Sequence, residues 1–247
     1  MCGRYCITSA PEAIRALFRY PERPNFPVRY NVAPTQPVPI VRLLDGERHF
    51  ALVRWGLIPA WVKDPKDFAL LINARGESLD EKPAFRNALK RRRCLFPADG
   101  FYEWKLEGGR RHAFHIRKPG GGPLAFAGLW ESWIGPNGEE LETAAIVTTQ
   151  ANREMGAVHH RAPAIVQPEQ FDLWLTGEAE THRATEIIKP APDGSMEVFE
   201  VSPAVNKVTN DSADLVERYT PPPESEQPPH PIRKKKRVAD SGQGSLF

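Results

Sequence analysis

Hydrophobic residues gather in many short stretches of this chain, whereas helical spacing is confined to a few segments. Short apolar stretches bounded by turn residues are typical of strands. Most of these stretches are separated by turns that contain glycine or proline, which favours antiparallel pairing. The pattern predicts an α+β fold with a mainly antiparallel, barrel-like sheet and flanking helices, not a doubly wound parallel sheet. The predicted strands are 38–44, 50–55, 94–96, 101–104, 112–116, 124–129, 143–149 and 196–201.

Three segments carry helix signals. Thr8 and Ser9 can cap a helix with a hydroxyl group, and Pro11 suits its first turn. A second helix is predicted over 83–89, where it leads into the basic run 90–93. A third is predicted to begin at Pro168 and to continue to residue 175.

The composition changes after residue 220. Residues 1–220 have the composition of one globular domain, whereas residues 221–247 are rich in proline and charge and poor in apolar side chains. Such a segment cannot bury enough apolar surface to fold, so the sequence predicts a disordered tail.

The composition indicates which classes of protein this chain can belong to. Apolar residues make up 40% of the chain, enough for a sizeable core, but no run of about 18 apolar residues predicts a membrane span. The first residues carry no export signal, so a cytosolic protein is expected. Three cysteines without a CxxC spacing indicate neither a disulfide framework nor a zinc ribbon, and no cofactor is expected. The formal net charge of +2 is too small to indicate nucleic-acid binding by itself.

The second residue is the most reactive candidate. Removal of Met1 would leave Cys2 with a free α-amine, whose ordinary pKa is about 7.7–8.0, beside a thiol with a pKa of about 8.5. These two groups on one residue can capture an aldehyde twice, first as an imine and then as a five-membered thiazolidine. The bland alternative is that Cys2 is an incidental residue on a frayed terminus.

Three further polar residues stand where packing does not require them. Asn73 follows an apolar run, Glu103 lies between Tyr102 and Trp104, and His159 precedes a second histidine. Partial burial between aromatic rings would raise the pKa of Glu103 and suit it to proton transfer. Taken singly, Asn73 could be a turn residue, Glu103 a solvent-facing strand residue and His159 a core histidine.

Seven short motifs occur in a fixed order, and together they resemble one family. They are Met-Cys-Gly-Arg at 1–4, Arg-Tyr-Asn-Val-Ala-Pro-Thr-Gln at 29–36, Trp-Gly-Leu-Ile-Pro at 55–59, Asn-Ala-Arg-Gly-Glu at 73–77, the segment 93–104, Ala-Gly-Leu-Trp at 127–130 and His-His-Arg at 159–161. The ordered set is similar to the SOS-response-associated peptidase (SRAP) domain and extends to about residue 210.

The resemblance implies a function and a set of catalytic residues. Members of the family recognise abasic sites in single-stranded DNA and form a covalent thiazolidine through an N-terminal cysteine, which corresponds to Cys2. Their catalytic asparagine, glutamate and histidine correspond to Asn73, Glu103 and His159. Which of Glu103 and His159 opens the closed sugar stays undecided.

The histidine assignment depends on spacing. The family pattern is His-x-Arg, and only His159, not His160, stands two residues before Arg161. Ala162 departs from the pattern, in which methionine is usual, and this leaves the packing beside the histidine open.

The resemblance also implies DNA contacts at Arg4, Arg75 and Arg161, which lie beside the catalytic positions in the sequence. Arginine and lysine bind phosphates, and exposed aromatic rings stack on the bases of single strands. On this ground Trp61 and the basic run 90–93 are further candidates. No base-reading pattern is visible, so little sequence preference is expected.

The last five residues, 243–247, resemble the bacterial sliding-clamp-binding pentapeptide Gln-x-Ser/Asp-Leu-Phe. In this motif Gln243, Leu246 and Phe247 would be the binding residues. On a flexible tether, such a peptide can place two apolar side chains in a preformed pocket. The basic run 233–237 would then tether DNA in a bacterial cytoplasm, near the replication fork, rather than direct nuclear import.

Other activities stay open from the sequence. A cysteine peptidase would use Cys2 as an N-terminal nucleophile, Asn73 as oxyanion donor and His159 as base, and self-removal of Met1 would fit it. An imine intermediate would also permit β-elimination, so weak lyase activity is expected. The protein is expected to be a monomer. A zinc module is a weaker alternative, because no short zinc motif has the spacing of its candidate ligands Cys2, Cys6, His112 and His115.

Overall fold

The computed structural model describes residues 2–177 and 181–220. The predicted tail 221–247, with its terminal pentapeptide, lies outside the described residues. The strands are β1 Tyr5–Ile7, β2 Arg29–Val32, β3 Pro37–Leu44, β4 Glu47–Trp55, β5 Asn73–Arg75, β6 Arg93–Ala98, β7 Gly100–Glu107, β8 Arg110–Arg117, β9 Leu124–Ile134, β10 Glu140–Gln150, β11 Arg161–Pro163 and β12 Glu197–Val201. The α-helices are α1 Pro11–Phe18, α2 Arg86–Arg91, α3 Arg153–Gly156, α4 Phe171–Leu175 and α5 Thr181–Glu186. Short 3-10 turns include η2 Gly76–Ser78, η3 Pro168–Gln170, η5 Pro203–Asn206 and η6 Ala213–Val216.

Five strands close into a barrel in the order β10, β4, β3, β6, β9 and back to β10. The β4–β10 pairing is parallel and the other four are antiparallel. The long strand β10 also pairs with β5 and β11. Closure satisfies the strand edges within the barrel, which an open sheet of this size would leave unpaired. The predicted α+β, mainly antiparallel and barrel-like fold is confirmed.

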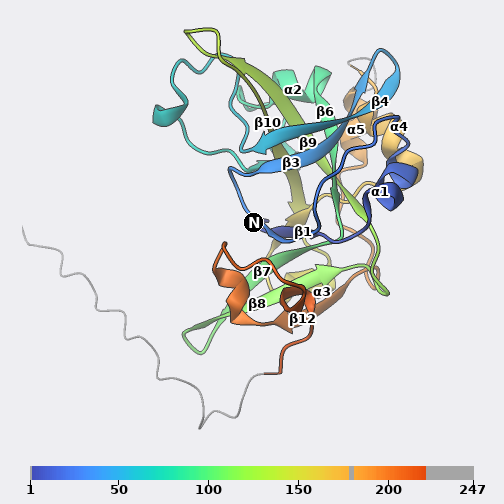
Figure 1. The fold of residues 1–247 in the computed structure, drawn as a ribbon, viewed down its shortest axis with the longest axis vertical. Coiled ribbons are helices and arrows are strands. Elements are labelled where there is room, and N and C mark those ends of the chain that lie inside the picture. Colours follow the sequence, from blue (N-terminus) through green and yellow to red (C-terminus); the bar gives the residue numbers. More distant parts are fainter. Residues whose placement is uncertain (1, 178–180, 221–247) are drawn as a thin grey trace, which may run out of the picture.

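A second, fully antiparallel sheet has the order β12-β8-β7-β1-β2. In Figure 1 its strands β7, β8 and β12 lie below the barrel strands, and its strand β1 lies between them and the barrel. Tyr5 of β1 packs edge-on against Trp55 and Phe126 of the barrel, with ring centroids 5.2 and 6.2 Å apart. These fully buried rings join the two sheets into one apolar core.

The helices flank the barrel. Phe18 at the end of α1 stacks on Phe171 at the start of α4, with centroids 5.1 Å apart, so the two helices cover one side of the barrel together. No helix within the described ranges is long and apolar enough to cross a membrane.

Each of the eight predicted strands occurs, with bounds that extend beyond or lie close to the prediction. The predicted hydroxyl cap of the first helix is wrong, because Ala10 takes the N-cap position without a side-chain hydrogen bond. The Ser9 hydroxyl donates instead to the buried carboxylate of Asp99. The second helix begins at Arg86, three residues later than Pro83, where it was expected to start.

Candidate functional site

The pairing of β1 with β7 places Cys2 beside the core. Tyr5 pairs with Phe101, and the amide of Tyr102 donates to the carbonyl of Arg4 over 2.9 Å. Cys2 is fully buried, and its Sγ donates weakly to the same carbonyl over 3.9 Å. Burial raises the pKa of the Cys2 thiol well above its usual range, and the negative charge of Glu103 raises it further. The thiol is therefore protonated near neutral pH.

Asn73 reaches Cys2 from the barrel. It pairs with Ile146 at the start of the parallel β5–β10 ladder. Its Nδ2 donates to the carbonyl oxygen of Cys2 over 2.8 Å. Its Oδ1 is buried and has no hydrogen-bond partner within the described ranges, so this acceptor is available to a group that enters the site.

Glu103 and His159 complete the cluster from two other segments. Glu103 projects from the middle of β7 and is only 5% exposed at its side chain. His159 lies between α3 and β11, with its Nδ1 4.0 Å from Glu103 Oε1. The backbone amide and the carbonyl oxygen of Arg161 both lie close to the same Nδ1, at 3.0 and 3.1 Å. The fold thus brings Cys2, Asn73, Glu103 and His159 together from four separate stretches of sequence.

Arg4 is held by the C-terminal part of the described chain. Its Nη1 donates to Asn31 Oδ1 over 2.7 Å and to the carbonyl of Val205 over 2.8 Å. Asn31 is fully buried, and its Nδ2 donates to carbonyls at Val205, Lys207 and Asn210. Arg4 therefore connects the leading segment to residues 205–210 in addition to any role with a ligand.

An apolar pocket of about 500 Å³ opens beside Asn73. Trp61 at its edge is 57% exposed and meets Phe68 edge-on, with centroids 5.5 Å apart. Arg75 is also exposed, and it lies two residues beyond Asn73 on β5. The residues around this pocket include Trp61, Leu71, Asn73, Arg75, Lys82 and Phe85. Two of the sequence candidates for DNA contact, Trp61 and Arg75, thus share one pocket with a catalytic candidate.

Arg161 is placed differently from Arg75. Its guanidinium is nearly buried and binds both carboxylate oxygens of Glu77, over 2.6 and 2.9 Å. It also donates to the carbonyl of Thr148 over 2.7 Å. The ion pair lowers the pKa of the Glu77 carboxyl below its usual range. Sequence reasoning missed Glu77 as a partner, although it ends the quoted 73–77 motif.

The basic run 90–93 does not act as one exposed patch. Arg93 is buried and donates to backbone carbonyls at Leu89, Trp174 and Gly177. Arg92 pairs with Glu131 over 2.7 Å. The expectation that Arg93 contacts DNA is wrong, because its guanidinium completes the packing between β6 and α4.

The proposed zinc ligands do not form one cluster. Cys6 Sγ lies 3.4 Å from His115 Nε2, but His112 instead pairs with Glu200 over 2.8 Å. Within the described ranges, no group of three or more histidine, cysteine or acidic residues is arranged to hold a metal ion.

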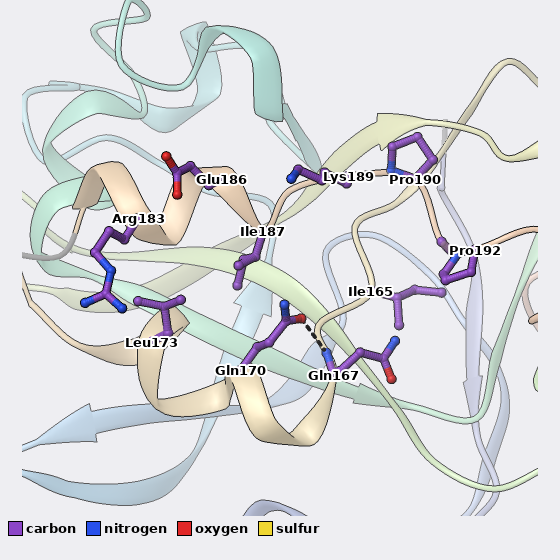
Figure 2. A pocket seen from close by; sticks show the side chains of 11 residues that line it. Ile165, Gln167, Gln170, Leu173, Arg183, Glu186, Ile187, Lys189, Pro190 and Pro192 are labelled. Atoms are coloured by element: carbon purple, nitrogen blue, oxygen red, sulfur yellow. Dashed lines mark hydrogen bonds between the residues drawn. The ribbon is translucent and has the colours of Figure 1, made fainter.

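A second pocket, of about 440 Å³, shares no residue with the cluster around Asn73. Figure 2 shows Leu173 and Ile187 at its apolar wall, with Gln167 and Gln170 joined by a hydrogen bond at its base. Arg183, Glu186 and Lys189 provide charges of both signs around it. No catalytic candidate lines this pocket.

The sequence and the fold have counterparts in known proteins. The SOS response associated peptidase (SRAP) family matches residues 1–208. The chain belongs to the SRAP family.

Several relatives of this SRAP chain bear the name "abasic site processing protein". YoqW of Bacillus subtilis is 38% identical, over 89% of this chain and all of the relative. YedK of Escherichia coli is 31% identical, over 88% of this chain and 99% of the relative. Among solved structures, a protein from Bacteroides thetaiotaomicron superposes with a TM-score of 0.77 at 25% identity, over 89% of this chain and all of the other. A phage-related protein from Bordetella bronchiseptica superposes with a TM-score of 0.64 at 31% identity, over 81% of this chain and 94% of the other.

Proposed function

We propose that this SRAP chain recognises abasic sites in single-stranded DNA and becomes covalently attached to them through Cys2. Relatives that align over nearly their whole length are named for abasic-site processing. The observation that carries the proposal is the hydrogen bond from Asn73 to the Cys2 carbonyl, because it holds the leading residue beside Glu103 and His159.

The reaction begins after Met1 has been removed. The Cys2 amine adds to the C1′ aldehyde of the ring-opened sugar, and loss of one water gives an imine. The thiol then adds across the C=N bond: sulfur bonds to C1′ and the thiol proton ends on nitrogen. The product is a thiazolidine, and the overall change is aldehyde plus aminothiol to thiazolidine plus water.

The environment of the thiol sets the order of these steps. Because its pKa is raised, the sulfur stays protonated and unreactive until the imine is formed. The amine, whose ordinary pKa is about 7.7–8.0, attacks first. Glu103 and His159 move protons during ring opening and loss of water, and the unpaired Oδ1 of Asn73 accepts a hydrogen bond from the amine or the sugar. An imine that loses a proton from C2′ would release the 3′ strand by β-elimination, so weak lyase activity is expected.

The DNA strand passes over the pocket beside Asn73. The exposed Arg75 neutralises a phosphate, and Trp61 stacks on a base next to the lesion. Arg4 adds positive charge on the leading segment, whereas the charge of Arg161 is balanced by Glu77.

The decisive experiment combines a denaturing gel with intact mass. Mature protein is incubated with a single strand that carries one abasic site, and an identical strand with an intact base serves as control. A denaturation-resistant adduct with the mass of protein plus DNA minus one water is expected. An adduct of equal yield on protein with an acetylated or Met1-blocked terminus would contradict the proposal.

The peptidase alternative depends on Asn73 as an oxyanion donor. In the structure the Asn73 amide is already bonded to the carbonyl of Cys2 itself, not to an open position for a peptide substrate. This contact favours the crosslinking function. Release of a fluorogenic peptide at a rate unaffected by Asn73→Ala would argue against any role of Asn73 as an oxyanion donor.

We also propose that the terminal pentapeptide binds the bacterial sliding clamp through Gln243, Leu246 and Phe247. Its likeness to the clamp-binding motif supports this, as does the proposed action on single-stranded DNA. Removal of residues 243–247 is expected to abolish capture by immobilised clamp while adduct formation stays unchanged. Equal capture with and without the pentapeptide would contradict it.

A further inference from the structure

Glu77 and Arg161 form a two-point ion pair that joins the two segments carrying Asn73 and His159. Glu77 lies in η2, directly after β5, and Arg161 begins β11. Both carboxylate oxygens accept from the guanidinium, over 2.6 and 2.9 Å. A bidentate pair of this kind fixes the relative orientation of its partners as well as their distance.

Gly76 lets the chain pass close to β10 directly before Glu77. A Cβ at this position would lie 2.4 Å from Ile188 Cγ2 and 3.2 Å from the carbonyl of Thr148. Thr148 is also the residue whose carbonyl accepts from Arg161. The close approach of residue 76 to β10 therefore brings the carboxylate to the guanidinium.

Arg161 in turn holds the imidazole of His159. Its backbone amide donates to His159 Nδ1 over 3.0 Å, and its Cα pairs with Gln150 of β10. The neighbouring carbonyl of His160 accepts from the amide of Ala151 over 3.1 Å. A shift of the Arg161 backbone would therefore rotate the His159 ring relative to Glu103.

The buried guanidinium of Arg161 has the Glu77 carboxylate as its charged partner. The residue is only 8% exposed, and its Nε is buried without a hydrogen-bond partner within the described ranges. The Glu77 side chain is 50% exposed, and without its carboxylate the guanidinium would keep the carbonyl and hydroxyl oxygens of Thr148 as acceptors. The ion pair therefore adds to the contacts that fix the position of Arg161 at the start of β11.

We propose that Glu77 is a positioning residue for His159, acting through Arg161. This inference rests on the proposed crosslinking function, in which His159 moves a proton. It assigns Glu77 no contact with the sugar. Instead, the Glu77 carboxylate sets the distance between the His159 ring and Glu103.

A double-mutant cycle tests the proposal. Glu77→Gln keeps the size of the side chain but removes the charge and one of the two acceptors. The rate of adduct formation at saturating DNA is expected to fall about tenfold in the wild-type background and to change less than about twofold in a His159→Ala background, because coupled residues are not additive. Glu12→Gln removes an exposed, ion-paired carboxylate on α1 and serves as the matched control.

A second measurement covers the case in which His159→Ala is too slow to measure. The ¹⁵N resonances of the His159 ring are expected to move in Glu77→Gln, in protein whose thermal unfolding midpoint lies well above the assay temperature. Equal rate losses in both backgrounds, an unchanged rate, or weaker DNA binding with an unchanged rate at saturation would each overturn the assignment. If the wild-type protein forms no adduct, the proposed function fails, while unmoved ring resonances would refute the positioning role on their own.

Discussion

Cys2 and Cys6 lie four residues apart, and the core buries both thiols completely or nearly so. Burial raises the pKa of each thiol, with a nearby carboxylate adding to the effect, Glu103 for Cys2 and Asp99 for Cys6. Cys6 even has an imidazole within 3.4 Å, that of His115, whereas the described neighbours of Cys2 include Asn73 and Glu103.

Under the proposed function, the comparison means that an imidazole beside a thiol is not enough to make a reactive site. Burial lowers the pKa of His115 to about 3, so its ring cannot readily accept a proton near neutral pH. The nitrogen of Cys6 is part of a peptide bond within the β1–β7 ladder. Cys2 differs because removal of Met1 would turn its nitrogen into a free amine, and because three other segments, those of Asn73, Glu103 and His159, meet beside it.

The largest expected contrast is between Cys2→Ala and Cys6→Ala. The first variant should form no adduct with abasic single-stranded DNA, whereas the second should keep the wild-type yield on a denaturing gel. Cys2→Ser should give an imine that borohydride traps but that does not survive denaturation without it. A stable adduct on Cys2→Ala would contradict the proposal that Cys2, and not Cys6, is the reactive cysteine.

Asn73→Ala is expected to slow adduct formation by about 10- to 100-fold, because misplacing a reacting group by about 1 Å has effects of this size. The Cys2 carbonyl would lose its donor, and the leading residue would no longer be held in place. Single-turnover rates at saturating DNA measure the effect. Asn137→Ala, which changes an exposed turn, is the control.

His115 should make folding stability depend on pH. Its pKa is about 3 in the folded protein, against an ordinary value of 6.5, so the unfolded chain binds the proton first as the pH falls. Stability is full above about pH 6.5 and falls by up to about 1.4 kcal/mol per pH unit on the way to about pH 3. Urea unfolding of wild type and His115→Leu over this range measures the difference in slope, and parallel curves would contradict it.

The smallest expected effect concerns the carboxylate charge beside each thiol. Glu103→Gln removes the negative charge that raises the pKa of Cys2, so iodoacetamide should alkylate Cys2 several-fold faster at pH 8, while the adduct forms more slowly. The alkylation rate of Cys6 should be the same in both proteins, because Asp99 and not Glu103 adds to the pKa of its thiol, and peptide mass mapping measures both sites. Slower alkylation of Cys2 would mean that Glu103 acts on the thiol through structure, not through charge.

The sequence pattern predicted the long strands because each carries several apolar residues between turn signals. It did not predict β1, β2, β5 or β11, which have three or four residues each and are held by partners distant in sequence. The helix-cap prediction failed for a similar reason: the Ser9 hydroxyl has a better acceptor in Asp99, 90 residues away.

For the site, residue types and motif order identified Cys2, Asn73, Glu103 and His159, and the fold places them together. The arginines were harder to interpret, because one residue type serves two purposes. Arg75 is exposed, whereas Arg93 and Arg161 are buried by contacts with α4 and with Glu77 that only the tertiary fold creates. No local pattern distinguishes a cation that faces solvent from one that holds two strands together.

The contacts of Asn31 bear on where this domain ends. The family match stops at residue 208, yet Asn31 receives support from the carbonyl of Asn210 and the carboxylate of Asp211, and Leu215 in η6 is completely buried. A protein shortened at the end of the family match would lose these anchors, and Arg4 would lose the rigidity of its acceptor. For expression or fusion, the smallest self-sufficient unit should therefore extend beyond Val216.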